Sequence, residues 1–387
     1  MSIIDQITAC HDEMTAWRRD LHAYPETAFE EIRTADFVAK KLESFGIAVH
    51  RGLAKTGLVG TLTNGTGGAI GLRADMDALD MEEQADVGYA SKVPGKMHAC
   101  GHDGHTTMLL GAAKYLSETR KFNGTVHFIF QPAEEMVGGG RVMVEEGLFE
   151  KFDVASVYGM HNWPNMPAGK MSVRAGPAMA SAASFEIMVT GKGSHAAAPH
   201  QGIDPIMIGA KIVTALQTIS SRITNPIEGI VVSITQFHAG DAMNVLPDRA
   251  ALKGTARSFA EDAPTAIEPL IRRIAENTAA AHGGAASLEY SHLYPVLINS
   301  ERESDLALRV AEDVVGSSDI YPEYPPSMAS EDFSFMLNER PGCFMRLGTG
   351  FNDRETFPLH STRYEFNDDV LPIGASYWAR LVETVLI

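Results

Sequence analysis

The chain has 387 residues, enough for two domains or for one domain with a large insertion. Hydrophobic residues make up 45% and charged residues 21%, which excludes a disordered, collagen-like or coiled-coil chain. The net charge of −17 argues against a nucleic-acid-binding protein and against attachment to an anionic membrane through basic residues.

The first half of the chain alternates between helical and extended patterns. Residues 31–45 are amphipathic with the period of a helix, and Gly46 is placed to end it. The other elements expected here are strands at 57–62, 69–74, 125–130 and 155–160 and a helix at 106–116. This alternation predicts an α/β domain with a mainly parallel sheet, in which functional sites form at the carboxyl ends of the strands.

The pattern changes near residue 182. Asp204 and Pro205 are typical of a helix N-cap and first turn, and the helix is expected to run to near residue 220. The other expected elements are strands at 184–190, 229–237, 248–259 and 286–292 and a helix at 264–281. The order β-α-β-β-α-β is that of a ferredoxin-like unit. We therefore expect an inserted domain at 182–296 and a discontinuous α/β domain at 1–181 plus 297–387.

The densest cluster of metal-ligating side chains lies at residues 97–105 (MHACGHDGH), before the helix predicted at 106–116. Thiolates and imidazoles are ligands for zinc and neighbouring divalent metals. The alternative is a glycine-rich turn with exposed histidines. Three histidines and a cysteine within eight residues favour a metal site. Because the chain has no second cysteine pair, we expect a catalytic metal rather than a zinc finger.

Two adjacent carboxylates, Glu134 and Glu135, follow the strand predicted at 125–130. One member of such a pair can bind a metal while the other acts as general base. An acidic pair is more often a solvated surface feature, but the position after a buried-looking strand favours function. The glycines at 138–140 lack the Lys-Ser/Thr ending of a P-loop, so we expect no phosphate site there.

Other polar side chains stand at comparable positions. His161 follows an apolar run and His360 lies beyond the predicted insertion. Each of them is either a metal ligand or a packed or surface histidine. Asp75 and Asp77 leave a predicted strand, where they either orient ligands or cap a turn.

The predicted insertion carries two further candidates, His195 and Asn244. A histidine and an asparagine can stabilise an oxyanion. Either residue can equally belong to a turn.

The cysteines and the first residues bear on the compartment. Cys10, Cys100 and Cys343 are odd in number and widely spaced, which is no disulfide framework. The N-terminal residues lack the basic region and long apolar stretch of a signal peptide, and no apolar run approaches the roughly 18 residues of a membrane span. We therefore expect a reduced, cytoplasmic protein.

Together these segments resemble the two-metal amidohydrolases and metallopeptidases related to aminoacylase and carboxypeptidase G. Within that family the similarity is to the branch of hippurate hydrolase, auxin-conjugate amidohydrolases and N-acetyldiaminopimelate deacetylase. The segments that carry the resemblance span nearly the whole chain: RRDLHAYPE (18–26), GLRADMDAL (71–79), MHACGHDGH (97–105), QPAEE (131–135), YGMHNWP (158–164), GSHAAAPH (193–200), NVLPD (244–248), GTARSF (254–259), SEDFS (330–334) and LHS (359–361).

The resemblance implies a fold, a metal centre and an oligomer. The ferredoxin-like insertion would be a lid or dimerisation domain, and the chain would form a homodimer or homotetramer. Two divalent metal ions (zinc, manganese, cobalt or nickel) would be held by Cys100, His102, Glu135, His161 and His360. Cys100 would stand where the wider family has a metal-bridging aspartate. The wider family's His-x-Asp motif is Asp75-Met76-Asp77 here, so His102 would replace the missing ligand.

The implied reaction is metal-assisted hydrolysis of the amide bond of N-acyl-L-amino acids, such as hippurate or N-acetyl amino acids. Glu134 would take a proton from water and return it to the leaving amine, and Asp77 would orient the site. His195 would reach the substrate carbonyl from the lid of the opposite subunit. Asn244 and Arg257 would contact the substrate, with Arg257 binding its carboxylate unless it is a sheet-surface arginine.

Three rival functions remain open. The nearest is a metallo-dipeptidase or carboxypeptidase with the same site, which only the acyl pocket would distinguish. A cysteine amidase with Cys100 as nucleophile would turn over without metal, but it leaves His161, His360 and Glu135 without a task. A non-catalytic binding protein on this scaffold would be favoured by the loss of Glu134 or of a ligand, and all of these residues are present.

Overall fold

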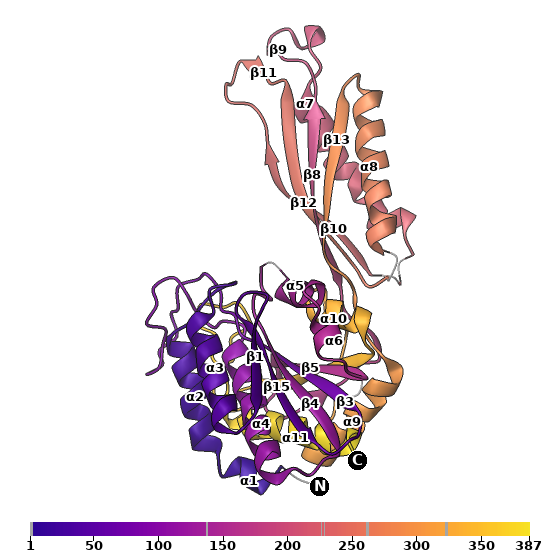
Figure 1. The fold of residues 1–387 in the computed structure, drawn as a ribbon. Coiled ribbons are helices and arrows are strands. Elements are labelled where there is room, and N and C mark those ends of the chain that lie inside the picture. The colour runs from indigo at the N-terminus through magenta and orange to yellow at the C-terminus, as the bar shows by residue number, and fades with distance from the viewer. Residues whose placement is uncertain (1–2, 137, 226, 228, 261–262, 322–323) are drawn as a thin grey trace. The chain divides into compact units, whose positions relative to one another are not determined.

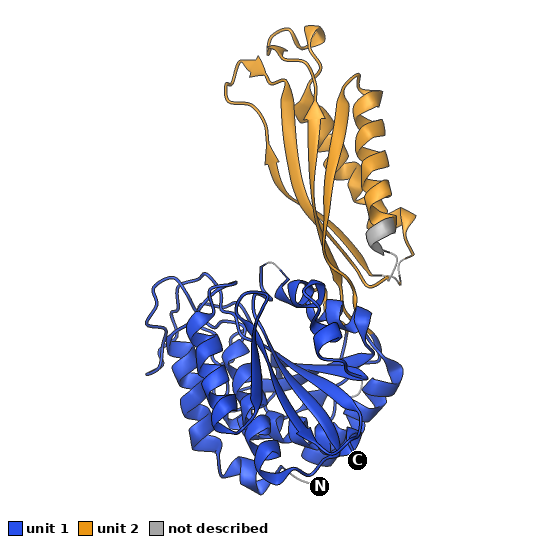
Figure 2. Cartoon of the chain, in the orientation of Figure 1, with its two compact units in different colours: residues 1–176, 298–325, 332–387 blue, residues 177–297, 326–331 orange. Residues whose placement is uncertain are grey.

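The computed structural model describes residues 3–136, 138–225, 227, 229–260, 263–321 and 324–387. It divides the chain into two compact units, which Figure 2 shows in different colours. The first unit consists of Met1–Gly176, Ile298–Pro325 and Asp332–Ile387, and the second of Pro177–Leu297 and Pro326–Glu331. The segment 326–331 thus groups with the second unit, whereas the expected α/β domain included it within 297–387.

The first unit contains a seven-stranded sheet and nine α-helices among its described residues. Its strands are β1 (Ala48–Leu53), β2 (Gly57–Asn64), β3 (Ala69–Asp75), β4 (Gly124–Gln131), β5 (Ser156–Pro167), β6 (Met171–Ser172) and β15 (Gly342–Gly350). Its helices are α1 (Asp5–Thr8), α2 (His11–Ala23), α3 (Ile32–Ser44), α4 (His102–Thr119), α5 (Gly139–Glu145), α6 (Leu148–Lys151), α9 (Glu301–Val315), α10 (Phe333–Glu339) and α11 (Leu371–Val385), with short 3-10 turns at η3 (Ser317–Asp319) and η4 (Asp368–Val370). Two of the boundaries between the units fall in the short strands β7 (Gly176–Met179) and β14 (Leu297–Asn299), and the other two lie on either side of residues 326–331. Within the described ranges, no helix has the length and apolar character needed to cross a membrane.

Figure 1 labels β1, β3, β4, β5 and β15 of the sheet in the first unit. The seven strands lie in the order β1-β2-β4-β3-β5-β15-β6. The middle strands β4, β3, β5 and β15 are parallel, and the outer strands β1, β2 and β6 pair antiparallel. This mixed, mainly parallel sheet confirms the predicted fold class. Helix α4 packs on β3 and contacts α2, α3 and α11, and the apolar side chains of these elements share one core.

Two local features position the chemistry at one end of this sheet. Strand β3 is buried from Ile70 to Asp75, as expected for a central parallel strand covered on both faces. Helix α4 starts at His102, directly after Gly101, whose φ of +87° lies in the left-handed region that glycine adopts without a Cβ penalty. The helix predicted at 106–116 therefore begins earlier than expected, and its first turn carries His102 and His105.

The second unit contains β8 (Ser181–Thr190), α7 (Pro205–Leu216), β10 (Ile230–His238), β12 (Arg249–Ser258), α8 (Ala263–Ala281) and β13 (Ala285–Tyr294) in chain order, with the short elements β9 (Ser194–His195), η1 (Pro199–Gln201), η2 (Ile219–Ile223) and β11 (Val245–Leu246). The four long strands form an antiparallel sheet in the order β10-β12-β8-β13, which confirms the predicted ferredoxin-like topology. The Asp204 carboxylate accepts from the backbone N–H groups of Ile206 and Met207, so Asp204 is the N-cap of α7 as predicted. The unit has its own apolar core, formed by side chains such as Phe185 and Ile212.

Candidate metal centre

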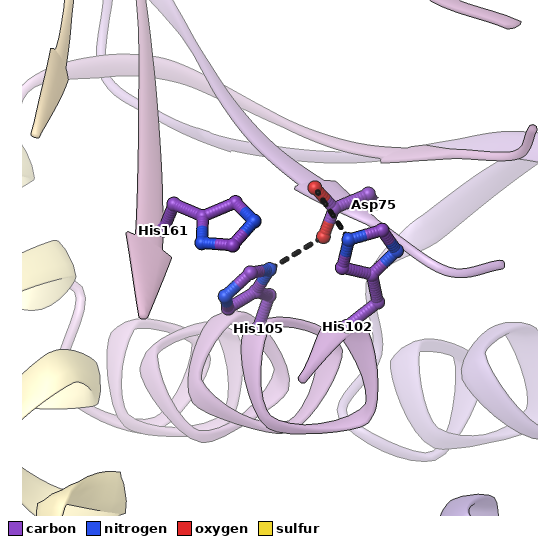
Figure 3. A group of neighbouring side chains, drawn as sticks. All are labelled: Asp75, His102, His105 and His161. Carbon is purple, nitrogen blue, oxygen red and sulfur yellow. Dashed lines mark hydrogen bonds and ion pairs between the residues drawn. The ribbon is translucent and has the colours of Figure 1, made fainter. Parts of the chain in front are cut away.

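Four metal-ligating side chains meet at the carboxyl ends of the central strands (Figure 3). Asp75 is the last residue of β3, and His161 on β5 lies just past the last residue that pairs with β3. His102 and His105, three residues apart, share one face of α4. One ligand atom from each lies within 4.8 Å of the others. A second group with the same spacing consists of Cys100, His102 and Glu135.

His105 uses both of its ring nitrogens in hydrogen bonds. Its Nε2 accepts from the backbone N–H of Asn162 at 2.9 Å, so the proton of the neutral ring lies on Nδ1. Nδ1 then donates to Asp75 Oδ1 at 2.6 Å. Neither nitrogen of His105 keeps a lone pair for a metal ion.

Asp75 is engaged through both of its oxygens. Oδ2 accepts from Arg73 at 2.7 Å, and Arg73 also donates to Asp332 at 2.9 Å, all three side chains being fully buried. Burial opposes ionisation, but His102 and Arg73 hold the pKa of the Asp75 carboxyl well below its usual range. Asp75 and His105 therefore form a charged, hydrogen-bonded support beside the candidate ligands.

His102 has one nitrogen without a hydrogen-bond partner among the described residues. Its Nδ1 lies 3.2 Å from Asp77 Oδ1, a carboxylate contact that places a ring proton on Nδ1. Its Nε2 is buried and lies 3.7 Å from Asp75 Oδ2 and 4.0 Å from Glu135 Oε1 (Figure 3 marks the contact with Asp75). The second oxygen of Asp77 accepts from the backbone N–H of Glu135 at 3.0 Å. One carboxylate thus orients two predicted ligands.

His161 and Cys100 face each other from a strand and a loop. His161 Nδ1 donates to the carbonyl oxygen of Asn162 at 2.7 Å, and its Nε2 lies 3.5 Å from Cys100 Sγ. The side-chain amide of Asn162 donates to the backbone carbonyl of Cys100. Asn162 therefore fixes the loop of Cys100 against the strand that carries His161.

His360 reaches the same place from the segment after β15. Its Nε2 lies 3.2 Å from Glu135 Oε1, and its side chain is 54% exposed. Its φ of +61° lies in the left-handed region, and its backbone N–H donates to the carbonyl of Ala99 at 2.9 Å. This bond ties His360 to the loop that holds Cys100.

The centre is rich in negative charge. Burial opposes protonation of His102, yet the carboxylates of Asp75 and Asp77 raise its pKa to about 10. Burial, together with the carboxylates of Glu135 and Glu134, raises the pKa of the Cys100 thiol well above its usual range. Both shifts show an environment that favours an added positive charge, which a bound cation provides.

The residues present fit a divalent metal ion. The available donor atoms are a sulfur, imidazole nitrogens and carboxylate oxygens, a set that suits zinc and its neighbours. In the described part of the chain, His102 Nε2 is buried without a hydrogen-bond partner, which is uncommon for a buried polar atom. The structure brings together the five residues expected to be ligands, Cys100, His102, Glu135, His161 and His360.

Glu134, the expected general base, directly precedes Glu135 on the turn between β4 and α5. It is 7% exposed and so lies within the protein rather than on a solvated surface. Its neighbour on the other side, Ala133, has a φ of +56° in the left-handed region.

The three remaining predicted residues belong to the second unit. His195 is exposed on β9, and the backbone carbonyl of Asn244 accepts from Ala196 at 2.9 Å, so His195 and Asn244 lie on neighbouring segments. Arg257 stands apart from them on β12, where it donates to the backbone carbonyl of Met328 at 3.2 Å.

Several members of this network were missed by sequence reasoning. His105 carried a signal, because it lies three residues after His102 on the same helix face. Asn162 is next to His161, but nothing in the neighbouring sequence indicates that its side chain supports the site. Asp332 pairs with Arg73 across 259 positions of sequence, and nothing near either residue indicates the contact.

The chain is similar to known metallohydrolases. Residues 71–384 match the sequence profile of Peptidase family M20/M25/M40. Hippurate hydrolase of Campylobacter jejuni is 41% identical over 98% of both chains. IAA-amino acid hydrolase ILR1-like 4 of Arabidopsis thaliana is 37% identical over 97% of this chain and 86% of that protein. A solved Bacillus subtilis structure, described as a dinuclear metal binding peptidase from the M20 family, covers 98% of this chain and 99% of that chain with a TM-score of 0.87 and 35% identity.

Proposed function

Because the chain belongs to peptidase family M20/M25/M40, in the branch of hippurate hydrolase and the IAA-amino acid hydrolases, we propose that it hydrolyses the amide bond of N-acyl-L-amino acids. The products are a carboxylate and the free amino acid. Hippurate is the first substrate to test, since the similarity to the Campylobacter jejuni hippurate hydrolase extends over 98% of both chains.

The observation that carries the proposal is the convergence of five donor side chains around the buried Nε2 of His102, which has no hydrogen-bond partner in the described part of the chain. We assign two divalent metal ions, zinc, manganese, cobalt or nickel, to Cys100, His102, Glu135, His161 and His360. The similar Bacillus subtilis structure, which is described as dinuclear, supports the number. When bound, such ions supply Lewis-acid activation of water and of the amide carbonyl.

The chain's own residues move the protons. Glu134 accepts a proton from the attacking water and returns it to the leaving amine. His195 Nδ1 accepts from the backbone N–H of Ala197 at 3.0 Å, so the proton of the neutral ring lies on Nε2. That N–H is the group we assign to the developing oxyanion.

The proposal also gives roles to the second unit, as a lid, and to the oligomer. His195 acts in the site of the opposite subunit of a homodimer or homotetramer, and Asn244 on the neighbouring segment contacts the same substrate. We assign Arg257 to the substrate carboxylate, in competition with its bond to Met328. The reaction takes place in the cytoplasm, where the free cysteines Cys10 and Cys100 stay reduced.

The environment of Cys100 argues against a cysteine amidase. A nucleophilic cysteine needs a lowered pKa, which positive neighbours provide. Here burial and the carboxylates of Glu135 and Glu134 raise the pKa of the thiol. Cys100 is therefore better suited to bind a cation than to attack an amide.

The decisive experiment measures hippurate hydrolysis by protein stripped of metal, before and after zinc, manganese, cobalt or nickel is added back. We expect activity to vanish on stripping and to return with metal. Activity that survives verified stripping would overturn the metal mechanism and favour Cys100 as nucleophile. If hippurate is not cleaved, N-acetyl amino acids and dipeptides are tested next, and cleavage of dipeptides alone would replace this proposal with a metallo-dipeptidase.

A further inference from the structure

Glu31 is the N-cap residue of α3, but its side chain does not cap the helix. The carboxylate of Glu26 does this instead and accepts from the backbone N–H groups of Arg33 at 3.0 Å and Thr34 at 2.8 Å. Because Glu26 caps the helix, the carboxylate of Glu31 is available for other partners.

Those partners lie on two distant segments. Glu31 Oε1 accepts from the backbone N–H of Ala133 at 2.9 Å, and Oε2 accepts from the Thr56 hydroxyl at 2.6 Å. Glu31 has no exposed surface. A buried carboxyl group with one donor on each oxygen holds both donors in place, because a buried donor that loses its acceptor carries the full cost of desolvation.

The segment that Glu31 holds is a constrained turn. Ala133 has a φ of +56°, a conformation that its Cβ disfavours, and its carbonyl accepts from the Gly139 N–H at 3.0 Å. A Cβ at Gly139 would lie 1.8 Å from the carbonyl oxygen of Pro132, so the backbones of Pro132 and Gly139 are in direct contact. Such a backbone persists only where its surroundings fix it.

The turn carries the two residues on which the proposed reaction depends. The N–H of residue 133 is held by Glu31, and the N–H of residue 135 is held by Asp77 at 3.0 Å. Glu134 lies between these two anchored positions. The buried carboxyl groups of Glu31 and Asp77 therefore fix the backbone on both sides of Glu134. In this way they determine where the carboxylates of Glu134 and Glu135 lie.

We propose that Glu31 is a positioning residue, which fixes the turn at Ala133 and thereby the placement of Glu134 and Glu135. The proposal rests on the function proposed above for these two carboxylates. It assigns Glu31 no contact with substrate or metal. Its contribution is to hold Glu135, the proposed metal ligand, and Glu134, the proposed general base, in place before metal or substrate binds.

The test compares three variants, Glu31→Ala, Glu31→Gln and the control Glu26→Ala. Glu26 lies on the same segment and caps the same helix, and its side chain accepts from the backbone N–H groups of Arg33 and Thr34. Zinc affinity is measured by competition with a chelator, and kcat and KM for hippurate are measured at saturating zinc. Glutamine keeps an acceptor for Ala133 and can donate to the Thr56 hydroxyl, so it is the conservative replacement.

We expect Glu31→Ala to lose about tenfold to a hundredfold in zinc affinity, the usual range for a lost outer-shell partner, and to lose kcat with little change in KM. Glu31→Gln should restore both quantities to within about threefold of wild type, because the geometry of the turn is kept. Glu26→Ala should lower the melting temperature and leave zinc affinity and kcat unchanged.

Two results would overturn the proposal. One is a Glu31→Ala protein with the zinc affinity and kcat of Glu26→Ala, and the other is a Glu31→Gln protein as impaired as Glu31→Ala. If Glu31→Ala does not fold, Thr56→Val removes one of the two donors and should lower zinc affinity by a smaller factor. If the wild type cleaves no acyl amino acid, the proposed function fails, while the zinc affinities still decide whether Glu31 positions the turn.

Discussion

Asp77 and His102 are joined by a buried contact of 3.2 Å between Oδ1 and Nδ1, and the other oxygen of Asp77 holds the backbone N–H of Glu135. The carboxylate therefore sets the tautomer of one predicted ligand and the backbone position of another. It does so without offering either oxygen to a metal ion.

Asp77→Asn should weaken zinc binding by about tenfold to a hundredfold. If the new amide faces His102 Nδ1, the ring proton moves to Nε2 and the lone pair for the metal is lost. If the new amide instead faces the backbone N–H of Glu135, two hydrogen-bond donors face each other and the bond that positions Glu135 is lost. Chelator competition measures the change, with the exposed Asp80→Asn as control. Unchanged affinity in Asp77→Asn would contradict the orienting role.

Glu134→Gln should separate chemistry from metal binding. An amide cannot take a proton from water, so kcat for hippurate should fall by about a hundredfold to ten-thousandfold, the usual contribution of a general base. Zinc content, measured by atomic absorption, should stay at the wild-type value because Glu135 is intact. A variant that keeps its zinc and near-normal turnover would exclude Glu134 as the base.

Mixed oligomers test whether His195 acts across subunits. His195→Ala and Glu134→Gln should each be inactive alone. When the subunits are unfolded together and reassembled in equal amounts, about a quarter of wild-type activity should return, because half the dimers are mixed and each holds one complete site. Mass spectrometry of differently tagged subunits verifies the exchange. Verified exchange without recovery would place His195 in its own subunit's site or outside the reaction.

Glu31 should make the stability of the first unit depend on pH. Burial raises its pKa from 4.5 to about 7, with a smaller contribution from the charge of Asp77. The folded protein thus binds this proton more tightly than the unfolded chain. The resulting stability is present below pH 4.5 and is lost as the pH rises towards 7.

The matching measurement uses metal-free wild type and Glu31→Gln. Urea unfolding is followed by tryptophan fluorescence, since Trp17, Trp163 and Trp378 all lie in the first unit. Between pH 5 and pH 8 the variant should gain about 2–3 kcal/mol relative to wild type, because glutamine has no charge to desolvate. A difference that is equal at both pH values would show that Glu31 does not titrate in this range.

Much of this architecture could be predicted because it depends on local patterns. The N-cap of α7 at Asp204 and the order of elements in the second unit follow from capping chemistry and from periodicity. The carboxylates after β3 and β4 stand at strand ends, where parallel sheets gather their functional groups. The clustering of cysteine and histidines at 97–105 marked the loop that the structure places beside them.

The supporting contacts could not be predicted, because they join residues that only the folded chain brings together. Glu31 meets Ala133 across 102 positions, and Arg73 meets Asp332 across 259. The different roles of His102 and His105 depend on one backbone N–H, that of Asn162, which occupies Nε2 of His105. In the sequence, two histidines on one helix face are equivalent. Only the folded position of the Asn162 N–H distinguishes them.

The parallel pairing of β5 with β15, for example Val157 with Gly342, has a consequence for the order of events on the ribosome. The four-stranded sheet of the inserted unit lies entirely within residues 181–294, so it can close while later codons are still being read. The central sheet must wait for β15, and the histidine at 360 emerges later still. The nascent chain therefore carries the four-stranded sheet of the second unit before the central sheet is complete. The proposed set of metal ligands is completed only when His360 has emerged, and α11 (Leu371–Val385) follows it.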